Sequence, residues 1–305
     1  MEIYHDLKHI TARPPVVLAV GSFDGLHRGH RKILETVRRE AQRRGVKSMI
    51  ITFAPTPREV LSGVKEIALM KPEEKIEKIE SAGIDILCIR KFDREFAGTD
   101  RDTFVDCLLT CMDLKALVAG PDHRVGSGSG GGIPWLKETG KKRGFDVLTV
   151  ERSQWGDREI SSQRIRRELR EGRIGDANAM LGYPYRISGT VVSGARRGRS
   201  MGFPTLNIKP DYPAVLIPAY GVYCVSVDVA GKKYDAICNI GMRPTFSEKE
   251  AALEVHVTGR ELGSLYGEAI GLSFRRYVRE ERKFENKEAL REQIRQDIET
   301  CKKSY

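Results

Sequence analysis

The sequence predicts two domains of different architecture: an N-terminal α/β domain with a doubly wound parallel sheet, and a smaller C-terminal domain of antiparallel β-strands. Two observations lead to this prediction. From residue 16 to about residue 151, short apolar runs alternate with segments of helical periodicity. After about residue 182, apolar runs follow one another with glycines between them. The chain has 305 residues, enough for two domains, and we expect the boundary between residues 182 and 183.

The N-terminal pattern is that of β-α-β units. Apolar runs such as VVLAV and KSMIITF indicate strands that are buried on both faces, as in a parallel sheet. The segment between them places Leu34, Val37 and Ala41 on one helical face and is expected to end at Gly45. The expected strands are 16–20, 47–53, 86–90, 116–120 and 146–150, and the expected helices are 31–44, 72–83, 101–112 and 133–144.

The C-terminal pattern begins with two short helical segments and continues with five β-rich runs. Such runs with turns between them predict a small antiparallel β-barrel, with a sandwich as the alternative. A terminal helix over 286–301 carries Leu290, Ile294 and Ile298 at four-residue spacing behind Asn286, a good N-cap residue. The helical segments are 160–172 and 174–182, and the β-rich runs are 185–194, 221–231, 232–241, 252–259 and 269–278.

The composition is that of a globular protein, with 40% hydrophobic and 31% charged residues. The net charge of +10 is compatible with nucleic acids, anionic membranes or nucleotide phosphates as partners, and does not choose among them. No segment approaches the roughly 18 to 20 apolar residues of a membrane span, and the N-terminus lacks a signal-peptide pattern. We therefore expect a cytoplasmic protein that does not bind membranes.

The cysteines give no sign of a disulfide framework or a metal site. The six cysteines contain no C-x-x-C pair, and a chain of this length needs no disulfide to fold, so all six are expected to be reduced. Cys107 and Cys111 share a helix face, and are interpreted as buried thiols rather than metal ligands.

The segment GSFDGLHRGH, residues 21–30, joins the first expected strand to the first expected helix. Its glycines allow a tight turn and the close approach of a ligand to the backbone. The helix N-terminus that follows attracts anions, and His27 and His30, three residues apart, can donate hydrogen bonds to a phosphate there. The spacing matches neither a P-loop nor a dinucleotide-binding motif. The pattern therefore predicts stabilisation of charge on phosphorus during group transfer.

A second glycine-rich segment, GARRGRSMGFPTLNI at 194–208, leads into a strand. Backbone N–H groups and arginines can bind a polyphosphate, and Thr205 and Asn207 can supply two oxygen ligands to Mg2+. An ordinary hairpin loop with a basic surface explains the same residues equally well. A third glycine-rich run, at 124–134, is either a flexible loop or, because it follows an expected strand of a parallel sheet, a mobile substrate loop.

The first motif resembles the G-x-F-D-G-x-H-x-G-H signature of bacterial riboflavin kinase/FAD synthetases, one branch of the H-x-G-H nucleotidyltransferases. The segments TFAPTPREVL (52–61), GPDHRVGSGSGGG (120–132) and ISSQRIRREL (160–169) are similar to later motifs of that family and stand in the same order. The resemblance covers essentially the whole chain. It implies that residues 1–182 transfer AMP from ATP to FMN, which gives FAD and pyrophosphate, with Mg2+.

The resemblance also implies the residues of this adenylyltransferase site. His27 and His30 hold the ATP phosphates and act in catalysis, and Asp24 lies beside them in the turn. The ATP-binding residues implied are Gly21, Phe23, Asp24, Gly25, His27, His30, Ser161, Ser162 and Arg164, and Asp122 and His123 are implied on the flavin side.

Three of these motifs depart from the family pattern. Thr56 stands where the family has His in a P-H-P segment, and Gln163 replaces the Thr of an I-S-S-T segment. His123 and Val125 replace two aromatic residues of the flavin-side loop. These replacements bear on the rate of adenylyl transfer or on the affinity for flavin.

The second motif is similar to the riboflavin kinase motif G-R-G-x-x-x-G-F-P-T-A-N, with Leu206 in place of Ala. The segments NIGMRPTF, LEVHV, SLYG and RRYVREERKF follow in family order, although EVHVTGREL departs from the usual EVH-x-x-D-F. The resemblance implies that residues 183–305 phosphorylate riboflavin to FMN with ATP.

In this kinase site the resemblance implies Glu254 as the catalytic base for the ribityl 5′-hydroxyl, and Arg279 as a flavin contact. Thr205 and Asn207 are implied as the Mg2+ ligands. His256, on the same strand face as Glu254, either makes a structural hydrogen bond or contacts a ligand. The implied ATP- and phosphate-binding residues are Gly194, Arg199, Gly202, Pro204, Thr205 and Asn207.

Three hypotheses follow for the whole chain. The first is a bifunctional enzyme that converts riboflavin to FMN and FMN to FAD, with both flavins as products rather than prosthetic groups. The second is a riboflavin kinase whose adenylyltransferase site is weakened or lost. The third is a basic nucleic-acid-binding protein, which the 7% aromatic content and the mixing of basic with acidic residues disfavour. The expected partners are ATP, riboflavin and FMN, without nucleic acid, for a monomer or weak homo-oligomer.

Overall fold

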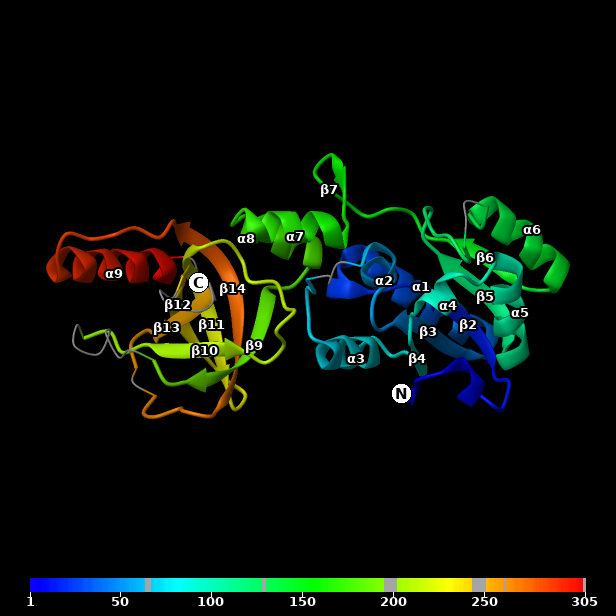
Figure 1. Ribbon diagram of the computed structural model, residues 1–305, viewed down its shortest axis with the longest axis horizontal. Helices are drawn as coiled ribbons and strands as arrows, with labels where there is room; N and C mark the ends of the chain where they lie inside the picture. The colour runs from blue at the N-terminus through cyan, green and yellow to red at the C-terminus, as the bar shows by residue number, and fades with distance from the viewer. Residues whose placement is uncertain (64–66, 128–129, 195–201, 243–250, 261, 304–305) are drawn as a thin grey trace. The chain divides into compact units, whose positions relative to one another are not determined.

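The computed structural model describes residues 1–63, 67–127, 130–194, 202–242, 251–260 and 262–303. The chain divides into two compact units (Figure 1). The first unit contains Met1–Ile67 and Lys71–Ile160, and the second contains Ala68–Met70 and Ser161–Tyr305.

The first unit is built on a six-stranded sheet in the order β1-β4-β3-β2-β5-β6. All neighbouring strands are parallel, which confirms the predicted doubly wound α/β architecture. The edge strand β1 was not expected, because a three-residue strand carries no periodicity. The strands are β1 (Glu2–Tyr4), β2 (Pro15–Val20), β3 (Lys47–Phe53), β4 (Ile86–Arg90), β5 (Asp113–Ala119) and β6 (Asp146–Thr149).

Helices surround this sheet, and a short hairpin follows β6 (Figure 1). The first long helix ends where the sequence predicts, because Gly45 adopts a φ of 66° and its N–H bonds to the Ala41 and Gln42 carbonyls. The elements are η1 (Leu7–His9), η2 (Asp24–Leu26), α1 (Arg28–Arg44), α2 (Pro57–Ser62), α3 (Pro72–Ser81), α4 (Arg94–Ala97), α5 (Arg101–Cys111), α6 (Ile133–Arg143), β7 (Gln154–Trp155) and β8 (Arg158–Glu159).

The connections of the central strands define where this unit can bind a ligand. The chain passes from β2 to β3 on one side, and β5 later pairs with β2 on the other side. The direction of winding therefore reverses between β2 and β5, and ligands of open α/β sheets bind at the carboxyl ends of such strands. Residues 21–30 follow β2 and residues 120–132 follow β5, so both motifs begin at this edge.

The second unit is a closed antiparallel barrel with strand order β10-β13-β12-β11-β14-β9, which confirms the predicted barrel. The terminal helix α9 begins where predicted, because the Asn286 side chain accepts a hydrogen bond from the Ala289 N–H at 2.8 Å. The elements are α7 (Ser162–Arg170), α8 (Ile174–Leu181), β9 (Tyr185–Val192), β10 (Leu206–Pro210), β11 (Gly221–Val229), β12 (Lys232–Met242), β13 (Ala251–Val257), β14 (Ala269–Arg279) and α9 (Lys287–Lys302).

Helices α7 and α8 belong to the barrel unit for a structural reason. The Asn178 side chain donates to the Phe274 carbonyl at 2.9 Å and accepts from the Tyr185 N–H at 2.7 Å, which ties α8 to β14 and β9. Compactness therefore divides the chain at Ser161. The boundary at 182/183, which the change of sequence pattern indicates, stays a prediction.

Within the described part of the chain, no helix has the length and apolar character that crossing a membrane requires.

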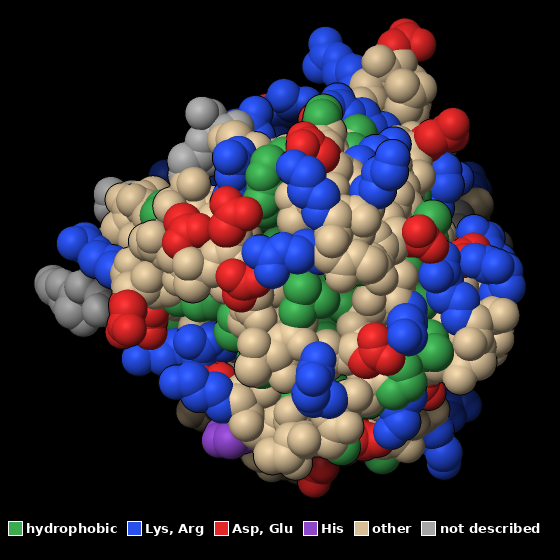
Figure 2. Space-filling model, turned by 90° about the vertical axis from the view of Figure 1, so that its right-hand side faces the viewer, with side chains coloured by type: hydrophobic (Ala, Val, Ile, Leu, Met, Phe, Trp, Pro, Cys, Tyr) green, Lys and Arg blue, Asp and Glu red, His purple; other side chains and the backbone are tan. Residues whose placement is uncertain are grey.

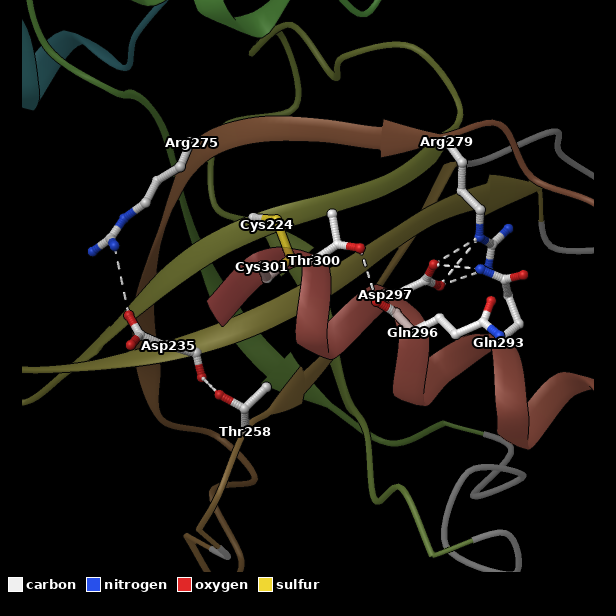
Figure 3. The surroundings of a disulfide bond; sticks show 10 residues. All are labelled: Cys224, Asp235, Thr258, Arg275, Arg279, Gln293, Gln296, Asp297, Thr300 and Cys301. Atoms are coloured by element: carbon white, nitrogen blue, oxygen red, sulfur yellow. Dashed lines mark hydrogen bonds and ion pairs between the residues drawn. A yellow bond between two sulfur atoms is a disulfide. The ribbon is translucent and has the colours of Figure 1, made fainter. Parts of the chain in front are cut away.

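The expectation that all six cysteines are reduced is wrong for two of them. Cys224 in β11 and Cys301 in α9 form a disulfide, with Cα atoms 5.4 Å apart (Figure 3). Both residues are buried, in an apolar cluster with Ile237, Ile294 and Ile298. The two cysteines are 77 positions apart, and only the packing of α9 against the barrel brings them together. No local sequence pattern could indicate that pairing.

The disulfide is expected to contribute about 4 kcal/mol to the free energy of unfolding, because it closes a loop of 77 residues in the unfolded chain. Denaturant unfolding with and without a dithiol reductant measures this contribution. Wild type and the control Cys107→Ser should lose stability on reduction, whereas Cys224→Ser should be insensitive. Thiol titration of the unreduced, unfolded protein should count the four free cysteines. A count of six free thiols would contradict the pairing.

Candidate active sites

The turn after β2 is made by backbone conformations that place its side chains inward. Phe23 and Leu26 have φ values of 48° and 34°, and Gly25 has 76°, a conformation that glycine adopts without strain. Phe23 and Asp24 are buried, with 1% and 4% of their surface exposed. The chain therefore changes direction sharply between the end of β2 and the start of α1.

The two histidines of this turn lie against each other. His27 is the N-cap of α1, and its Nδ1 accepts a hydrogen bond from the His30 N–H at 3.3 Å. The imidazole rings are stacked, with centroids 3.7 Å apart. A Cβ atom on Gly29 would lie 3.3 Å from the His27 ring, so a glycine at this position gives the ring its room. The spacing H-x-G-H thus has a geometric cause.

Both imidazoles are neutral at pH 7. Burial lowers the pKa of His27 from 6.5 to about 4, and burial also lowers the pKa of His30 well below 6.5. Because the Nδ1 of His27 accepts a hydrogen bond, the neutral ring carries its proton on Nε2, where it can donate. The His30 Nδ1 is buried without a hydrogen-bond partner in the structure. The turn therefore offers neutral donors beside a helix N-terminus, which suits a phosphate.

A third histidine, which is half-buried, stands at the neighbouring strand end. His123 follows β5, and its Nε2 is also buried without a hydrogen-bond partner in the structure. Burial lowers the pKa of His123 to about 4. Asp122, beside it, is exposed and pairs with Arg152. In this loop the His123 ring therefore points its Nε2 inward, whereas Asp122 is exposed.

The second unit contains a cavity of about 460 Å3 at the strand β10 motif. Thr205 and Asn207 line it together with Arg260 and Tyr266. The remaining lining residues are Val191, Gly202, Pro204, Leu206, Val257, Leu262, Gly263, Ser264 and Leu265.

Strand register places Glu254 between two asparagines. Asn207 of β10 is directly opposite Glu254 of β13, and Glu254 is directly opposite Asn239 of β12. Opposite residues of antiparallel strands share a face, so the three side chains form one row. A Cβ atom on Gly194 would lie only 2.0 Å from the Asn207 Nδ2, which means that the chain at Gly194 passes directly over this amide.

His256 has a structural partner. Its Nδ1 lies 2.9 Å from the Pro204 carbonyl, and its ring meets the Phe203 ring edge to face at 5.3 Å. Because a carbonyl only accepts, the Nδ1 carries the proton. His256 therefore fixes the segment that precedes Thr205. Of the two roles considered for His256, a structural hydrogen bond and a ligand contact, the structure supports the first.

The residues present fit a magnesium ion that arrives with ATP. Mg2+ commonly takes one or two oxygen ligands from the protein and completes its shell with phosphate oxygens and water. Thr205 and Asn207 supply a hydroxyl and an amide oxygen at one cavity. In the described ranges no group of three His, Cys, Asp or Glu side chains could hold a metal ion by itself. Arg199 of the same motif lies outside the described residues.

Comparisons with known proteins agree on both halves of the chain. Residues 9–164 match the FAD synthetase family, and residues 181–305 match the riboflavin kinase family. The bifunctional riboflavin kinase/FMN adenylyltransferase of Bacillus subtilis is 36% identical over 299 residues, which cover 96% of this chain and 93% of that protein. The Escherichia coli K12 enzyme of the same name is 34% identical over 311 residues, which cover 100% and 98%. The chain belongs to this bifunctional family.

One solved structure matches over the whole chain. It is a crystal structure of a protein described as a macrolide-efflux protein from Streptococcus pneumoniae, with a TM-score of 0.89, 98% coverage of both chains and 27% sequence identity. The likeness extends over both units of the fold, and the description is that of the other protein.

Two of the departures from the family pattern have local explanations in the structure. Thr56 is the N-cap of α2, and its hydroxyl accepts from the Glu59 N–H at 3.3 Å. Val125 is 5% exposed and packs in the core of the first unit, with Phe104 and Leu136 among its cluster. Neither replacement therefore removes a group from the turn that carries His27.

The glycine-rich run after β5 packs closely on α5. A Cβ atom on Gly126 would lie 2.3 Å from the Arg101 nitrogen, and one on Gly131 would lie 2.0 Å from the Val125 oxygen. The Arg101 guanidinium donates to the Gly130 carbonyl at 2.6 Å. Close packing thus explains these glycines, while 128 and 129 lie outside the described residues.

The segment ISSQRIRREL (160–169), which the resemblance assigns to ATP binding in the adenylyltransferase, contains the start of α7. Helix α7 belongs to the barrel unit. Ser161 is the N-cap, and its hydroxyl accepts from the Arg164 N–H at 3.2 Å, while Ser162 is the first helical residue. The Arg164 side chain lies 3.8 Å from the Glu168 carboxylate. These three residues thus have structural roles, and their contact with ATP stays a prediction.

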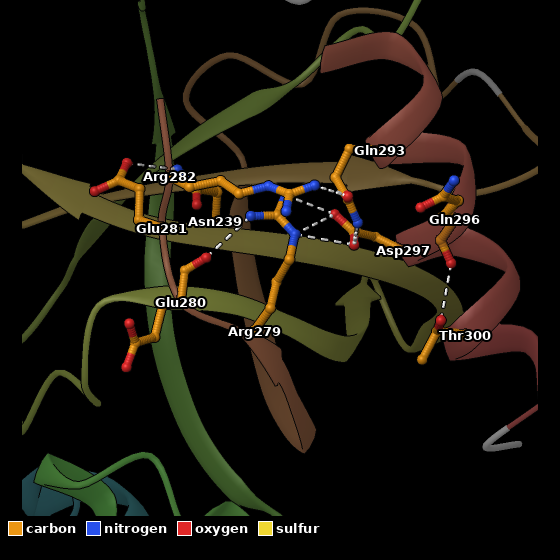
Figure 4. A network of polar contacts seen from close by, with 9 residues as sticks. All are labelled: Asn239, Arg279, Glu280, Glu281, Arg282, Gln293, Gln296, Asp297 and Thr300. Carbon is orange, nitrogen blue, oxygen red and sulfur yellow. Dashed lines mark hydrogen bonds and ion pairs between the residues drawn. The ribbon is translucent and has the colours of Figure 1, made fainter. Parts of the chain in front are cut away.

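Arg279 ties the terminal helix to the barrel. Its guanidinium donates to both carboxylate oxygens of Asp297 in α9, through Nε at 3.1 Å and Nη2 at 2.8 Å (Figure 4). Asp297 is 2% exposed and also accepts from the Gln293 amide at 2.8 Å. With its donors engaged in this way, Arg279 holds α9 in place, and its predicted contact with flavin stays a prediction.

Sequence reasoning missed several residues of these sites. Arg260 and Tyr266 line the kinase cavity, and Tyr266 lies in the SLYG segment, whose place in the family order was the only available signal. Asn239 joins the row of Glu254 through strand register, which no sequence pattern gives. Lys75 reaches the histidine turn from α3, although its helix reads as a solvated charged face.

His123 is expected to make the protein less stable in acid. Its folded-state pKa of about 4 lies below the unfolded value near 6.5, so the unfolded chain binds the proton first as the pH falls. The free energy of unfolding is unaffected by this histidine above pH 6.5. It falls between pH 6.5 and pH 4, where His123 is protonated in the unfolded chain but not in the folded one. From pH 7.5 to pH 4.5 this amounts to about 2 kcal/mol.

The variant His123→Phe should lose that part of the pH dependence, which denaturant unfolding at the two pH values measures. The exposed residue His5 offers the matched control, because His5→Phe should keep the wild-type dependence. Equal losses of unfolding free energy in wild type and His123→Phe would show that the imidazole is not buried as described.

Proposed function

We propose that this chain makes FAD from riboflavin in two steps, with FMN as the product of the barrel unit and the substrate of the α/β unit. The observation that carries the adenylyltransferase step is the stacked, neutral His27–His30 pair at the end of β2. The observation that carries the kinase step is the row of Asn207, Glu254 and Asn239 beside the β10 cavity.

In the adenylyltransferase step, a phosphate oxygen of FMN attacks the α-phosphorus of ATP, and pyrophosphate leaves with the electrons of the broken bond. His27 and His30 donate hydrogen bonds to phosphate oxygens as their charge changes. Gly21, Phe23, Asp24 and Gly25 shape the turn that holds ATP. Ser161, Ser162 and Arg164 are assigned to ATP contacts, and His123 to the flavin side, with Asp122 next to it.

In the kinase step, Glu254 accepts the proton of the ribityl 5′-hydroxyl, whose oxygen attacks the γ-phosphorus of ATP. Thr205 and Asn207 hold Mg2+, which neutralises phosphate charge when it is bound. Gly194 and Gly202 bring the backbone close to the nucleotide, Pro204 orients Thr205, and Arg199 and Arg279 are assigned to phosphate and flavin contacts.

The other two hypotheses have less support. A kinase without adenylyltransferase activity would not explain why His27 and His30 form a stacked, neutral pair at the end of β2. A nucleic-acid binder would need a continuous basic stripe, but Lys and Arg side chains alternate with Asp and Glu on the face drawn in Figure 2. We assign small-molecule substrates only, a cytoplasmic location, and a monomer or weak homo-oligomer.

Product analysis tests the proposal. Purified protein with riboflavin, ATP and Mg2+ should form FMN first and FAD later, as separated by chromatography. FMN that accumulates without FAD under excess ATP would support the kinase-only hypothesis. Formation of neither flavin would overturn both steps.

A further inference from the structure

Lys75 is a partly buried lysine in the first turn of α3 whose head group contacts the histidine turn. Its Nζ donates to the Ser22 carbonyl at 3.1 Å. The hydroxyl of Thr52, which is 2% exposed, donates to the same oxygen at 3.1 Å. Ser22 lies between β2 and η2, so the ammonium group is held against the segment that carries His27 and His30.

Charge balance gives this lysine a chemical meaning. The two imidazoles are neutral at pH 7, so they donate hydrogen bonds without offsetting the negative charge of ATP. Asp24, 4% exposed, adds a carboxylate to the same turn. Arg31 also acts on this site from α1, but its side chain is exposed, where water and salt screen its charge.

Lys75 is electrostatically coupled to both groups of the turn. Burial lowers the pKa of Lys75 from 10.5, while the nearby Asp24 carboxylate acts in the opposite direction. The charge of Lys75 also contributes to the low pKa of His30. The buried Nδ1 of His30, which has no hydrogen-bond partner in the structure, is a second sign that a polar ligand belongs at this turn.

We propose that Lys75 binds the polyphosphate of ATP in the adenylyltransferase site and offsets the charge that develops on the departing pyrophosphate. The inference rests on the adenylyltransferase function proposed above. As the FMN phosphate oxygen bonds to the α-phosphorus, the bond from that phosphorus to pyrophosphate breaks, and its electron pair leaves on the pyrophosphate oxygen. A fixed cation close to that oxygen lowers the barrier more than a neutral donor does.

Three variants separate the charge of Lys75 from its structural bond. Lys75→Gln removes the charge but keeps an N–H donor for the Ser22 carbonyl, Lys75→Met removes both, and Lys75→Arg keeps the charge. Lys78→Met, one turn along α3, is the matched control, because Lys78 pairs with Glu74 of its own helix at 3.8 Å. Kinase activity of the same molecules should stay at the wild-type level, since the barrel unit contains none of these changes, and thermal unfolding of each variant reports on the folding of the α/β unit.

For FAD formation from FMN, Lys75→Gln and Lys75→Met should lose about a hundredfold in kcat/KM for ATP. Their inhibition by added pyrophosphate should weaken tenfold or more, while the KM for FMN changes little. Lys75→Arg should stay within about tenfold of wild type, and Lys78→Met within about twofold. A purely structural role would instead spare Lys75→Gln and leave pyrophosphate inhibition unchanged.

Two outcomes would overturn the proposal. One is full FAD formation by Lys75→Gln, and the other is a loss of activity without any change in pyrophosphate inhibition. If Lys75→Met does not fold, Lys75→Gln and Lys75→Arg decide alone. Wild-type protein that converts no FMN to FAD would contradict the proposed function itself, which is a different result from an active Lys75→Gln.

Discussion

Replacement of both His27 and His30 by alanine is expected to lower the rate of FAD formation from FMN by about a thousandfold or more. The loss follows from the geometry of the turn. The rings are stacked at 3.7 Å, and His27 also caps α1, so the double variant removes both donors and one helix cap. The rate of riboflavin phosphorylation should stay within about twofold, because the residues proposed for the kinase step belong to the barrel unit.

The appropriate comparison is the variant His5→Ala, which removes an exposed histidine of the same unit. It should keep both activities. Initial rates of FAD formation from FMN and of FMN formation from riboflavin, measured separately by chromatography, give the two numbers. Loss of FMN formation in the His27/His30 variant would contradict the assignment of these residues to adenylyl transfer alone.

Glu254→Gln is expected to lower riboflavin phosphorylation by about a hundredfold to ten-thousandfold, because it removes the carboxylate that we propose as the base for the hydroxyl proton. The change is nearly isosteric, so the row with Asn207 and Asn239 should persist and the barrel should stay folded. Conversion of supplied FMN to FAD should be unaffected.

Glu288→Gln, at an exposed position of α9, tests whether loss of a carboxylate in general affects the kinase. It should keep wild-type activity in both assays. If Glu254→Gln phosphorylates riboflavin at the wild-type rate, Glu254 is not the base. The row of Asn207, Glu254 and Asn239 would then have a role other than catalysis.

The fold could be predicted largely because its strongest signals are local. The mainly apolar runs of β2 and β3, the helix stop at Gly45 and the cap at Asn286 each depend on a few neighbouring residues. Strand β1 has only three residues and pairs in parallel with β4, far along the chain, so it lacked such a signal. Helix α8 is tied to the barrel by two hydrogen bonds of the Asn178 side chain, which periodicity does not reveal.

The candidate sites were predictable where their residues share one motif. The spacing of His27 and His30 in one turn indicated a phosphate site, whereas for Thr205 and Asn207 only the family resemblance decided between a metal site and an ordinary hairpin loop. Lys75 reaches the histidine turn across more than forty positions, and its charged neighbours on α3 gave no reason to select it.

The Cys224–Cys301 pairing was missed for the same reason as Lys75, since the separation of 77 positions is bridged only in the fold. The length and cysteine spacing of the chain also led to a wrong prediction for this pair. Whether a chain needs a disulfide in order to fold has no bearing on whether α9 packs a thiol against β11.

The central claim is that one chain carries two independent sites that share FMN as a freely exchanging intermediate. The most direct test mixes the His27/His30 double alanine variant with Glu254→Gln and supplies riboflavin, ATP and Mg2+. Alone, the first should stop at FMN and the second should leave riboflavin unchanged. The mixture should form FAD. A mixture that forms no FAD, or either variant alone carrying riboflavin through to FAD, would contradict the account.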